Sequence, residues 1–258
     1  MKFAISGKGG TGKTTLAGVL AHYFNNDGYN VLAVDADPDA NLASAIGIPR
    51  DQAASIISIS NERQLIKERT GADARQFGQM FKLNPTVNDI ADKYGIDFKG
   101  IKLLVMGGVQ RGGNGCACPE NVLLRNLLSE LILNRDEVVI VDMEAGIEHL
   151  GRATAHSIDK MLITVEPGSR SISTAKSVIK LGKEIGIESF GIVGNKIQDN
   201  KQKNWIQSQF PPGQILGMIP YDEIVQNADL NEQPLIELLD ERLRTEFNKI
   251  YAACKLSP

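Results

Sequence analysis

Short apolar runs alternate with longer amphipathic segments along most of the chain. Val, Ile and Leu fill consecutive positions in the short runs, which is typical of strands covered by helices on both faces. The expected strands are Lys2–Ser6, Val31–Asp35, Lys102–Met106, Val138–Asp142, Lys160–Val165, Ser189–Gly194 and Gln214–Met218. The expected helices are Lys13–Asn26, Asn41–Ile46, Glu120–Asn134, Ser171–Ile185, Lys201–Ser208, Asp222–Asp229 and Leu235–Cys254. The pattern predicts an α/β fold with a doubly wound, mostly parallel sheet and helices on both faces.

The alternation is interrupted between about residues 50 and 100. Asn61–Arg69 and Val87–Tyr94 are compatible with short helices, and Asn84–Pro85 with a turn. We interpret this part as an insertion at the ligand edge of the sheet, a plausible lid, and not as an independent domain. Residues 1–258 are therefore expected to form a single domain.

Charge and composition argue against several kinds of partner. The net charge of −3 provides no basic field for nucleic acid or an anionic membrane. No apolar stretch reaches the ~18–20 residues that span a bilayer, and the N-terminal segment resembles a strand more than a signal peptide. Three cysteines are too few for a disulfide framework. We expect a cytoplasmic protein with reduced thiols that binds neither nucleic acid nor membrane.

A glycine-rich stretch lies between the first expected strand and the first expected helix. From residue 7 to residue 15 it reads GKGGTGKTT, which is a complete P-loop in its usual context. In such a loop the backbone N–H groups surround the phosphates of ATP or ADP, Lys13 reaches the β- and γ-phosphates, and the Thr14 hydroxyl contacts Mg²⁺. The residues expected to bind the nucleotide here are Gly9, Gly10, Thr11, Gly12, Lys13, Thr14 and Thr15.

A second lysine follows the first glycine of the loop. Lys8 is not needed to hold a nucleotide within one subunit. It marks the deviant Walker A group, in which this lysine typically crosses a dimer interface to the partner's phosphates. We therefore count Lys8 among the catalytic residues and expect a homodimer.

Carboxylates follow the second expected strand, in the sequence Asp35-Ala36-Asp37-Pro38-Asp39. Carboxylates at the carboxyl end of a strand beside a P-loop are suited to orienting water and to contacting the water ligands of Mg²⁺. We assign Asp37 to the attacking water and Asp35 to an outer-shell role near the metal. Asp39 is compatible with helix capping.

A third group of candidates follows the strand at residues 138–142. An apolar strand that ends in an aspartate, here Asp142, is a Walker B pattern, in which the aspartate holds a water ligand of Mg²⁺. Gly146 is free to turn and to donate its N–H to the γ-phosphate, which predicts a switch loop.

The edge of the base is expected to meet residues near the C-terminal strands. The Asn195 amide can both donate to and accept from adenine, although a simple turn asparagine is the alternative. Lys196 follows it, and Pro220 begins a segment expected to close over the base.

Two thiols, Cys116 and Cys118, lie in a glycine-rich loop just before the expected helix at 120–134. A helix N-terminus favours thiolates, and Pro119 suits a first helical position. One chain supplies two ligands, which is half of a tetrahedral or square-planar site, and a two-fold dimer supplies four. Small buried residues or a redox pair are the alternatives. Cys254 is expected to be packed in the last helix.

The chain resembles the MinD/ParA/nitrogenase-iron-protein group of ATPases over essentially its whole length. The residues that carry this resemblance are Lys8 with Lys13, the Asp35–Pro38 switch, Asp142 and Asn195. The Cys-x-Cys loop and the stretch from Asp142 to Arg152 resemble the CooC family. That resemblance implies an ATP-dependent accessory ATPase that inserts nickel into carbon monoxide dehydrogenase, its client. A related accessory protein of acetyl-CoA synthase shares these marks. The implied cofactors are ATP or ADP, Mg²⁺ and Ni²⁺, with Zn²⁺ possible at the same thiols.

Two other functions are compatible with parts of this pattern. A reductase similar to the nitrogenase iron protein would hold an iron–sulfur cluster through one cysteine before a helix and another in the second switch. Cys116 resembles the first, but the second position is Ala145 here, and the other thiol lies beside the first as Cys118. A ParA-like partition ATPase would not need the cysteine pair and would want a basic surface for DNA.

Overall fold

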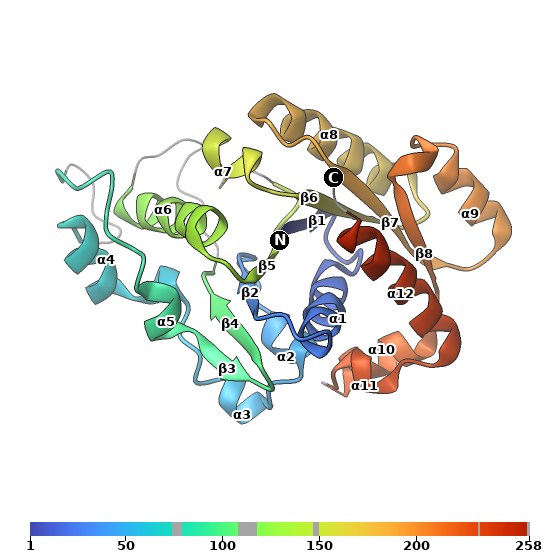
Figure 1. The fold of residues 1–258 in the computed structure, drawn as a ribbon, viewed down its shortest axis with the longest axis horizontal. Helices are drawn as coiled ribbons and strands as arrows, with labels where there is room; N and C mark the ends of the chain where they lie inside the picture. Colours follow the sequence, from blue (N-terminus) through green and yellow to red (C-terminus); the bar gives the residue numbers. More distant parts are fainter. Residues whose placement is uncertain (74–78, 108–117, 147–149, 232, 257–258) are drawn as a thin grey trace.

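The computed structural model describes residues 1–73, 79–107, 118–146, 150–231 and 233–256. Its centre is one sheet with the strand order β3-β4-β2-β5-β1-β6-β7-β8 (Figure 1). The strands are β1 (Lys2–Gly7), β2 (Val31–Asp35), β3 (Ile96–Phe98), β4 (Ile101–Val105), β5 (Val138–Asp142), β6 (Lys160–Val165), β7 (Phe190–Ile197) and β8 (Ile215–Pro220). Every pairing is parallel except that of β3 with β4. The predicted doubly wound α/β fold is confirmed.

Helices cover both faces of this sheet. The α-helices are α1 (Lys13–Asn26), α2 (Leu42–Ile46), α3 (Arg50–Ala53), α4 (Arg63–Thr70), α5 (Ile90–Tyr94), α6 (Pro119–Asn134), α7 (Arg152–His156), α8 (Ser169–Ile185), α9 (Asn200–Gln207), α10 (Glu223–Leu230), α11 (Leu235–Leu238) and α12 (Glu241–Lys255). Two short 3₁₀ helices, η1 (Ile59–Asn61) and η2 (Pro212–Gln214), complete the described elements.

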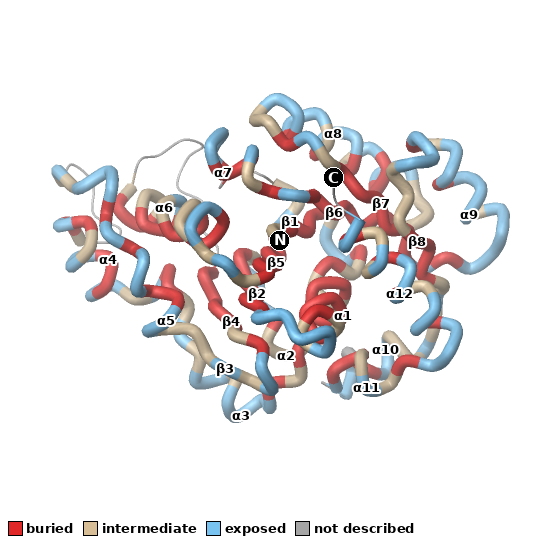
Figure 2. Tube along the Cα trace, viewed as in Figure 1, coloured by how far each residue is buried: buried red, intermediate tan, exposed pale blue. Residues whose placement is uncertain are grey.

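The hydrophobic core consists of one apolar layer on each face. Apolar residues of α1, α2, α11 and α12 pack together on one face. Those of α4, α6, α8 and α9 pack on the other. Figure 2 shows the resulting pattern, with buried strands in the middle and outer helices exposed on one side. The consecutive apolar residues of the strands are explained by these two layers.

The edge strand β3 was not predicted. It pairs antiparallel with β4 through a tight turn at Lys99 and Gly100, whose φ angles are 48° and 86°. Positive φ at both central positions is the geometry of a type I′ hairpin. Gly100 suits this turn, but Lys99 is not the Asn, Asp or Gly usual at its first central position, so the turn had only a weak sequence signal. Charged Asp97 is exposed on this short edge strand, a feature that limits edge-to-edge pairing.

The part between residues 50 and 100 contributes to the core of the domain. Ile59, Leu65 and Ile66 are fully buried, and α4 packs against α6. The segment therefore continues the apolar layer on one face of the sheet beyond β4. Its role as a lid stays a prediction.

The C-terminal region is not the single helix expected over residues 235–254. Leu239 has extended backbone angles (φ −58°, ψ 119°) and ends α11. Asp240 then caps α12, because its Oδ1 accepts a hydrogen bond of 2.8 Å from the backbone N–H of Leu243. The apolar spacing continues across the break, which is why periodicity alone did not reveal it. Within the described residues, none of the helices combines the length and the apolar character that a bilayer crossing requires.

Candidate functional site

The P-loop connects β1 to α1 at the carboxyl edge of the sheet. Gly10 and Gly12 have φ angles of 80° and 92°, which L-residues with side chains rarely adopt. A Cβ atom at Gly12 would lie 2.2 Å from Asn195 Nδ2, so a side chain has no room there. The glycines therefore allow both the turn of the loop and its close approach to β7. Lys13 opens α1 as predicted and is almost fully buried.

Lys13 and Asp37 come together although they lie on different elements. The Lys13 Nζ is 3.8 Å from Asp37 Oδ2, and both side chains are largely shielded from solvent. The other carboxylate oxygen of Asp37 accepts a hydrogen bond of 3.0 Å from the backbone N–H of Asp39. The residue predicted to orient water thus lies beside the residue predicted to bind the γ-phosphate.

Asp35 is fully buried and holds the backbone of the same switch. Its Oδ2 accepts from the N–H of Leu42 at 2.9 Å, and its Oδ1 from the N–H of Asp37 at 3.2 Å. Burial raises the pKa of Asp35 to about 6, against the lowering effect of these hydrogen bonds. The structure therefore shows Asp35 organising the loop that carries Asp37. Its predicted role near Mg²⁺ stays a proposal.

Asp142 ends β5 opposite the end of β2 and next to the start of α1. Thr14 Oγ1 donates a hydrogen bond of 2.6 Å to its Oδ2. Its Oδ1 is buried and has no hydrogen-bond partner among the described residues. Burial is the main reason that the pKa of Asp142 rises to about 7, and the nearby Asp35 carboxylate raises it further. A buried carboxylate oxygen left free beside a threonine hydroxyl is suited to Mg²⁺ or to one of its water ligands.

Two hollows flank the P-loop. One, of about 510 Å³, is lined by Gly9, Lys13, Asp37 and Gly146 among others, so it brings the predicted switch residues to the P-loop. The other, of about 560 Å³, lies on the side of β7 and β8 and is lined by Gly12, Thr15, Asn195, Lys196, Pro220 and Tyr221 among others. Their positions on either side of Lys13 are suited to the γ-phosphate and to the nucleoside, respectively.

The amide of Asn195 is bonded to the P-loop. Its Nδ2 donates to the carbonyl of Thr11 at 2.9 Å, and its Oδ1 accepts from the N–H of Lys196 at 2.8 Å. Lys196 has a left-handed φ of 58°, and its Nζ donates to the carbonyl of Gly10 at 2.7 Å. Sequence reasoning missed the two bonds from Asn195 and Lys196 to the P-loop carbonyls. The predicted contact of Asn195 with adenine stays a prediction.

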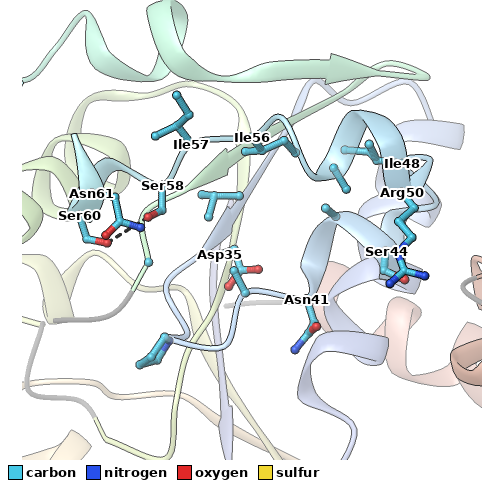
Figure 3. Close-up of a pocket in the computed structure, with 16 residues that line it drawn as sticks. Asp35, Asn41, Ser44, Ile48, Arg50, Ile56, Ile57, Ser58, Ser60 and Asn61 are labelled. Atoms are coloured by element: carbon cyan, nitrogen blue, oxygen red, sulfur yellow. Dashed lines mark hydrogen bonds between the residues drawn. The ribbon is translucent and has the colours of Figure 1, made fainter. Parts of the chain in front are cut away.

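A further hollow of about 670 Å³ is lined in part by Pro38, Ala40 and Asn41, which follow Asp37 in the switch (Figure 3). Asp35 lies in its middle, between Asn41 on one side and Ser58 on the other. None of the described residues that line it belongs to the P-loop. No sequence signal pointed to it, because its walls come from segments brought together only by the fold.

The predicted metal site is described only in part. Cys118 is the N-cap of α6, where its Sγ accepts a hydrogen bond of 3.5 Å from the N–H of Asn121, and Pro119 follows at the first helical position as predicted. Cys116 lies outside the described residues. In the described part of the chain, no three His, Cys, Asp or Glu side chains are grouped to hold a metal ion. Cys254 is buried as expected, and burial raises its pKa to about 12.

The strand, P-loop, Walker B aspartate and switch carboxylates define a P-loop ATPase of the deviant Walker A class. Residues 2–235 match the family described as the CobQ/CobB/MinD/ParA nucleotide binding domain. The chain belongs to this family and, within it, to the group of the carbon monoxide dehydrogenase accessory protein CooC. It is 45% identical to CooC of Rhodospirillum rubrum over 229 residues, which cover 89% of this chain and 87% of that protein.

Two other similarities were found, and the second of them concerns the fold alone. The chain is 44% identical to an uncharacterized ATP-binding protein of Methanocaldococcus jannaschii, over 97% of this chain and 96% of that protein. The septum site-determining protein MinD of Pyrococcus horikoshii, solved with Mg-ADP, has the same fold, with a TM-score of 0.67 at 20% identity; the match covers 99% of this chain and 97% of that one. The protein is thus an ATPase that uses ATP with Mg²⁺ and has an accessory function.

Proposed function

We propose that the protein is an ATP-driven nickel chaperone that loads carbon monoxide dehydrogenase or the related acetyl-CoA synthase. The observation that carries this proposal is the similarity to CooC, whose name describes an accessory protein of carbon monoxide dehydrogenase. Cys118 at the start of α6 supports it, since a cysteine sulfur is a soft ligand for a metal ion such as nickel or zinc. The metal ion is the cargo of the protein and is bound between two chains.

In the proposed reaction, Lys13 binds the β- and γ-phosphates and Thr14 with Asp142 would hold Mg²⁺, which neutralises phosphate charge. Asp37 leaves Lys13 when the γ-phosphate takes its place and then orients the attacking water. The N–H of Gly146 donates a hydrogen bond to the γ-phosphate, and the switch loop loses this bond when the phosphate leaves. Asn195, Lys196 and Pro220 surround the nucleoside side of the site.

Lys8 of each subunit reaches the nucleotide of the partner, so ATP favours a closed homodimer. A ligand shifts such an equilibrium only through different affinities for the two states, and the bridging lysine supplies that difference. Closure brings the Cys116 and Cys118 thiolates of both subunits together around one soft metal ion. Hydrolysis reopens the dimer and releases the ion to the client. Zinc also suits four thiolates, and nickel is favoured by the relationship to CooC.

The test is the transfer of nickel to a nickel-free client. Purified protein loaded with ⁶³Ni²⁺ is mixed with nickel-deficient carbon monoxide dehydrogenase, and in parallel with nickel-deficient acetyl-CoA synthase, with and without MgATP. We expect MgATP to accelerate transfer to one client, and Lys13→Ala to abolish that acceleration. Transfer that is equally fast without ATP, or with the Lys13→Ala protein, would contradict the proposal.

A further inference from the structure

A buried pair of threonine hydroxyls lies directly beneath the turn that carries Lys8. Thr11 Oγ1 is 2.7 Å from the carbonyl oxygen of Lys8 and 2.7 Å from Thr164 Oγ1 on β6. Thr11 has no exposed surface and Thr164 has 1%. Solvent therefore cannot replace the bond between the two threonine hydroxyls.

The positions of the hydrogens follow from the partners. The Lys8 carbonyl accepts the backbone N–H of Thr11 at 3.2 Å and, at 2.7 Å, the single hydroxyl hydrogen of Thr11. The 2.7 Å contact with Thr164 then requires that Thr164 donates to Thr11. Thr164 also lies 3.5 Å from the carbonyl of Ser6, which is a much longer alternative. The bonds thus run in one direction, from Thr164 through Thr11 to Lys8.

Thr164 also supports the beginning of the same turn. It is the register partner of Gly7 in the sheet, and a Cβ atom at Gly7 would lie 2.5 Å from its Oγ1. Gly9 and Gly10 form the exposed top of the turn, and nothing within 4 Å would meet a Cβ atom at either position. Lys196 holds the turn at Gly10, where its Nζ donates to the carbonyl, and Thr164 supports the turn from below.

From this geometry we infer that Thr164 is a positioning residue for Lys8. Through Thr11 it fixes the Lys8 carbonyl, and so the direction in which the Lys8 side chain leaves the loop. A preorganised side chain loses less conformational entropy when it binds across an interface. This inference rests on the proposed bridging role of Lys8, and Thr164 lines neither of the two hollows beside the P-loop.

The test compares Thr164→Val, which keeps the shape and removes the hydroxyl, with Thr164→Ser, which keeps the hydroxyl. The first readout is hydrogen exchange of the peptide spanning residues 7–12 in the nucleotide-free protein. We expect faster exchange in Thr164→Val and nearly wild-type exchange in Thr164→Ser. Thr11→Val provides a second route to the same loss, and the double variant should exchange no faster than either single one. Wild-type exchange in both single valine variants would overturn the inference.

The second readout is dimerisation driven by a non-hydrolysable ATP analogue. We expect Thr164→Val to weaken it by up to about tenfold, the cost of ordering one long side chain at an interface. Thr164→Ser, which keeps the hydroxyl, should dimerise like the wild type. Equal weakening in Thr164→Ser and Thr164→Val would show that the hydroxyl is not what positions Lys8 and would overturn the inference. If Lys8→Ala itself dimerises normally, the bridging role fails, and the exchange result still decides whether the two hydroxyls hold the turn.

Discussion

The Lys13 ammonium lies 3.8 Å from the Asp37 carboxylate in a site shielded from solvent. A γ-phosphate beside Lys13 would compete with this carboxylate for the same positive charge. Asp37 is then free to turn toward a water molecule, because the γ-phosphate replaces its carboxylate as the negatively charged partner of Lys13. The pairing therefore links occupancy of the phosphate site to the position of the residue proposed to orient water.

We predict that Asp37→Asn binds ATP with nearly wild-type affinity and hydrolyses it about 100-fold more slowly, because the group that orients the water is lost. Phosphate release measures the rate, and titration with a fluorescent ATP analogue measures affinity. Asp39→Asn is the matched control, since Asp39 is an exposed neighbour on the same switch. Normal turnover in Asp37→Asn would remove this residue from the mechanism.

Lys8→Ala is expected to fold and to bind ATP as a monomer, because Lys13 and the glycines of the loop are intact. It should fail to dimerise with a non-hydrolysable ATP analogue and should lose most hydrolysis, since the charge that reaches the partner's phosphates is missing. Light scattering measures the mass in solution. Lys203→Ala on the exposed side of α9 is the control. An undiminished Lys8→Ala dimer would exclude a bridging role.

Asp142 should make the stability of the protein depend on pH when nucleotide and Mg²⁺ are absent. Its pKa is about 7 in the folded protein against an ordinary value of 3.8, so the folded state binds more protons than the unfolded state between these values. The contribution of Asp142 to the free energy of unfolding therefore falls as pH rises from about 4 to about 7.

Asp142→Asn cannot ionise, so its free energy of unfolding relative to wild type should increase between pH 5 and pH 8. Urea denaturation at each pH measures the difference. Asp97→Asn on the exposed edge strand β3 controls for the loss of one charge. A difference between Asp142→Asn and wild type that does not change with pH would contradict the prediction.

The elements around the P-loop followed from local sequence, and the contacts that organise the site did not. The P-loop motif predicts a glycine-rich turn at residues 10 and 12 and a helix that begins at Lys13. The structure has both. The bond from Asn195 to the Thr11 carbonyl joins residues 184 positions apart. Such a contact depends on the order of β1, β6 and β7 in the sheet, which no local pattern encodes.

The single helix expected over residues 235–254 was wrong, although the sequence also carried a signal for a second helix start. The apolar spacing after residue 235 is helical throughout, and Asp240 with its capping bond interrupts it. Asp240 followed by Glu241 was a readable helix start. The role of Asp35 near the metal stays a prediction. What the sequence did not reveal is that both of its oxygens accept from the switch backbone, because a buried carboxylate finds such donors only once the chain has folded.

Anaerobic treatment with iron and sulfide separates a metal chaperone from an electron carrier. We expect no stable, redox-active [4Fe–4S] cluster, because the second switch carries Ala145 in place of a thiol. Absorption and electron paramagnetic resonance spectra report the cluster. A stoichiometric cluster that reduces a partner during ATP hydrolysis would favour the reductase.

In the proposed mechanism, two chains share one metal ion through four thiolates. Native mass spectrometry during titration with Ni²⁺ tests this most directly, with Cys116→Ser, Cys118→Ser and the buried-thiol control Cys254→Ser alongside the wild type. We predict one nickel ion per dimer, dimerisation by metal even without ATP, loss of tight binding in either loop variant and little change in Cys254→Ser. One tightly bound ion per monomer, or wild-type affinity in Cys118→Ser, would contradict the shared site.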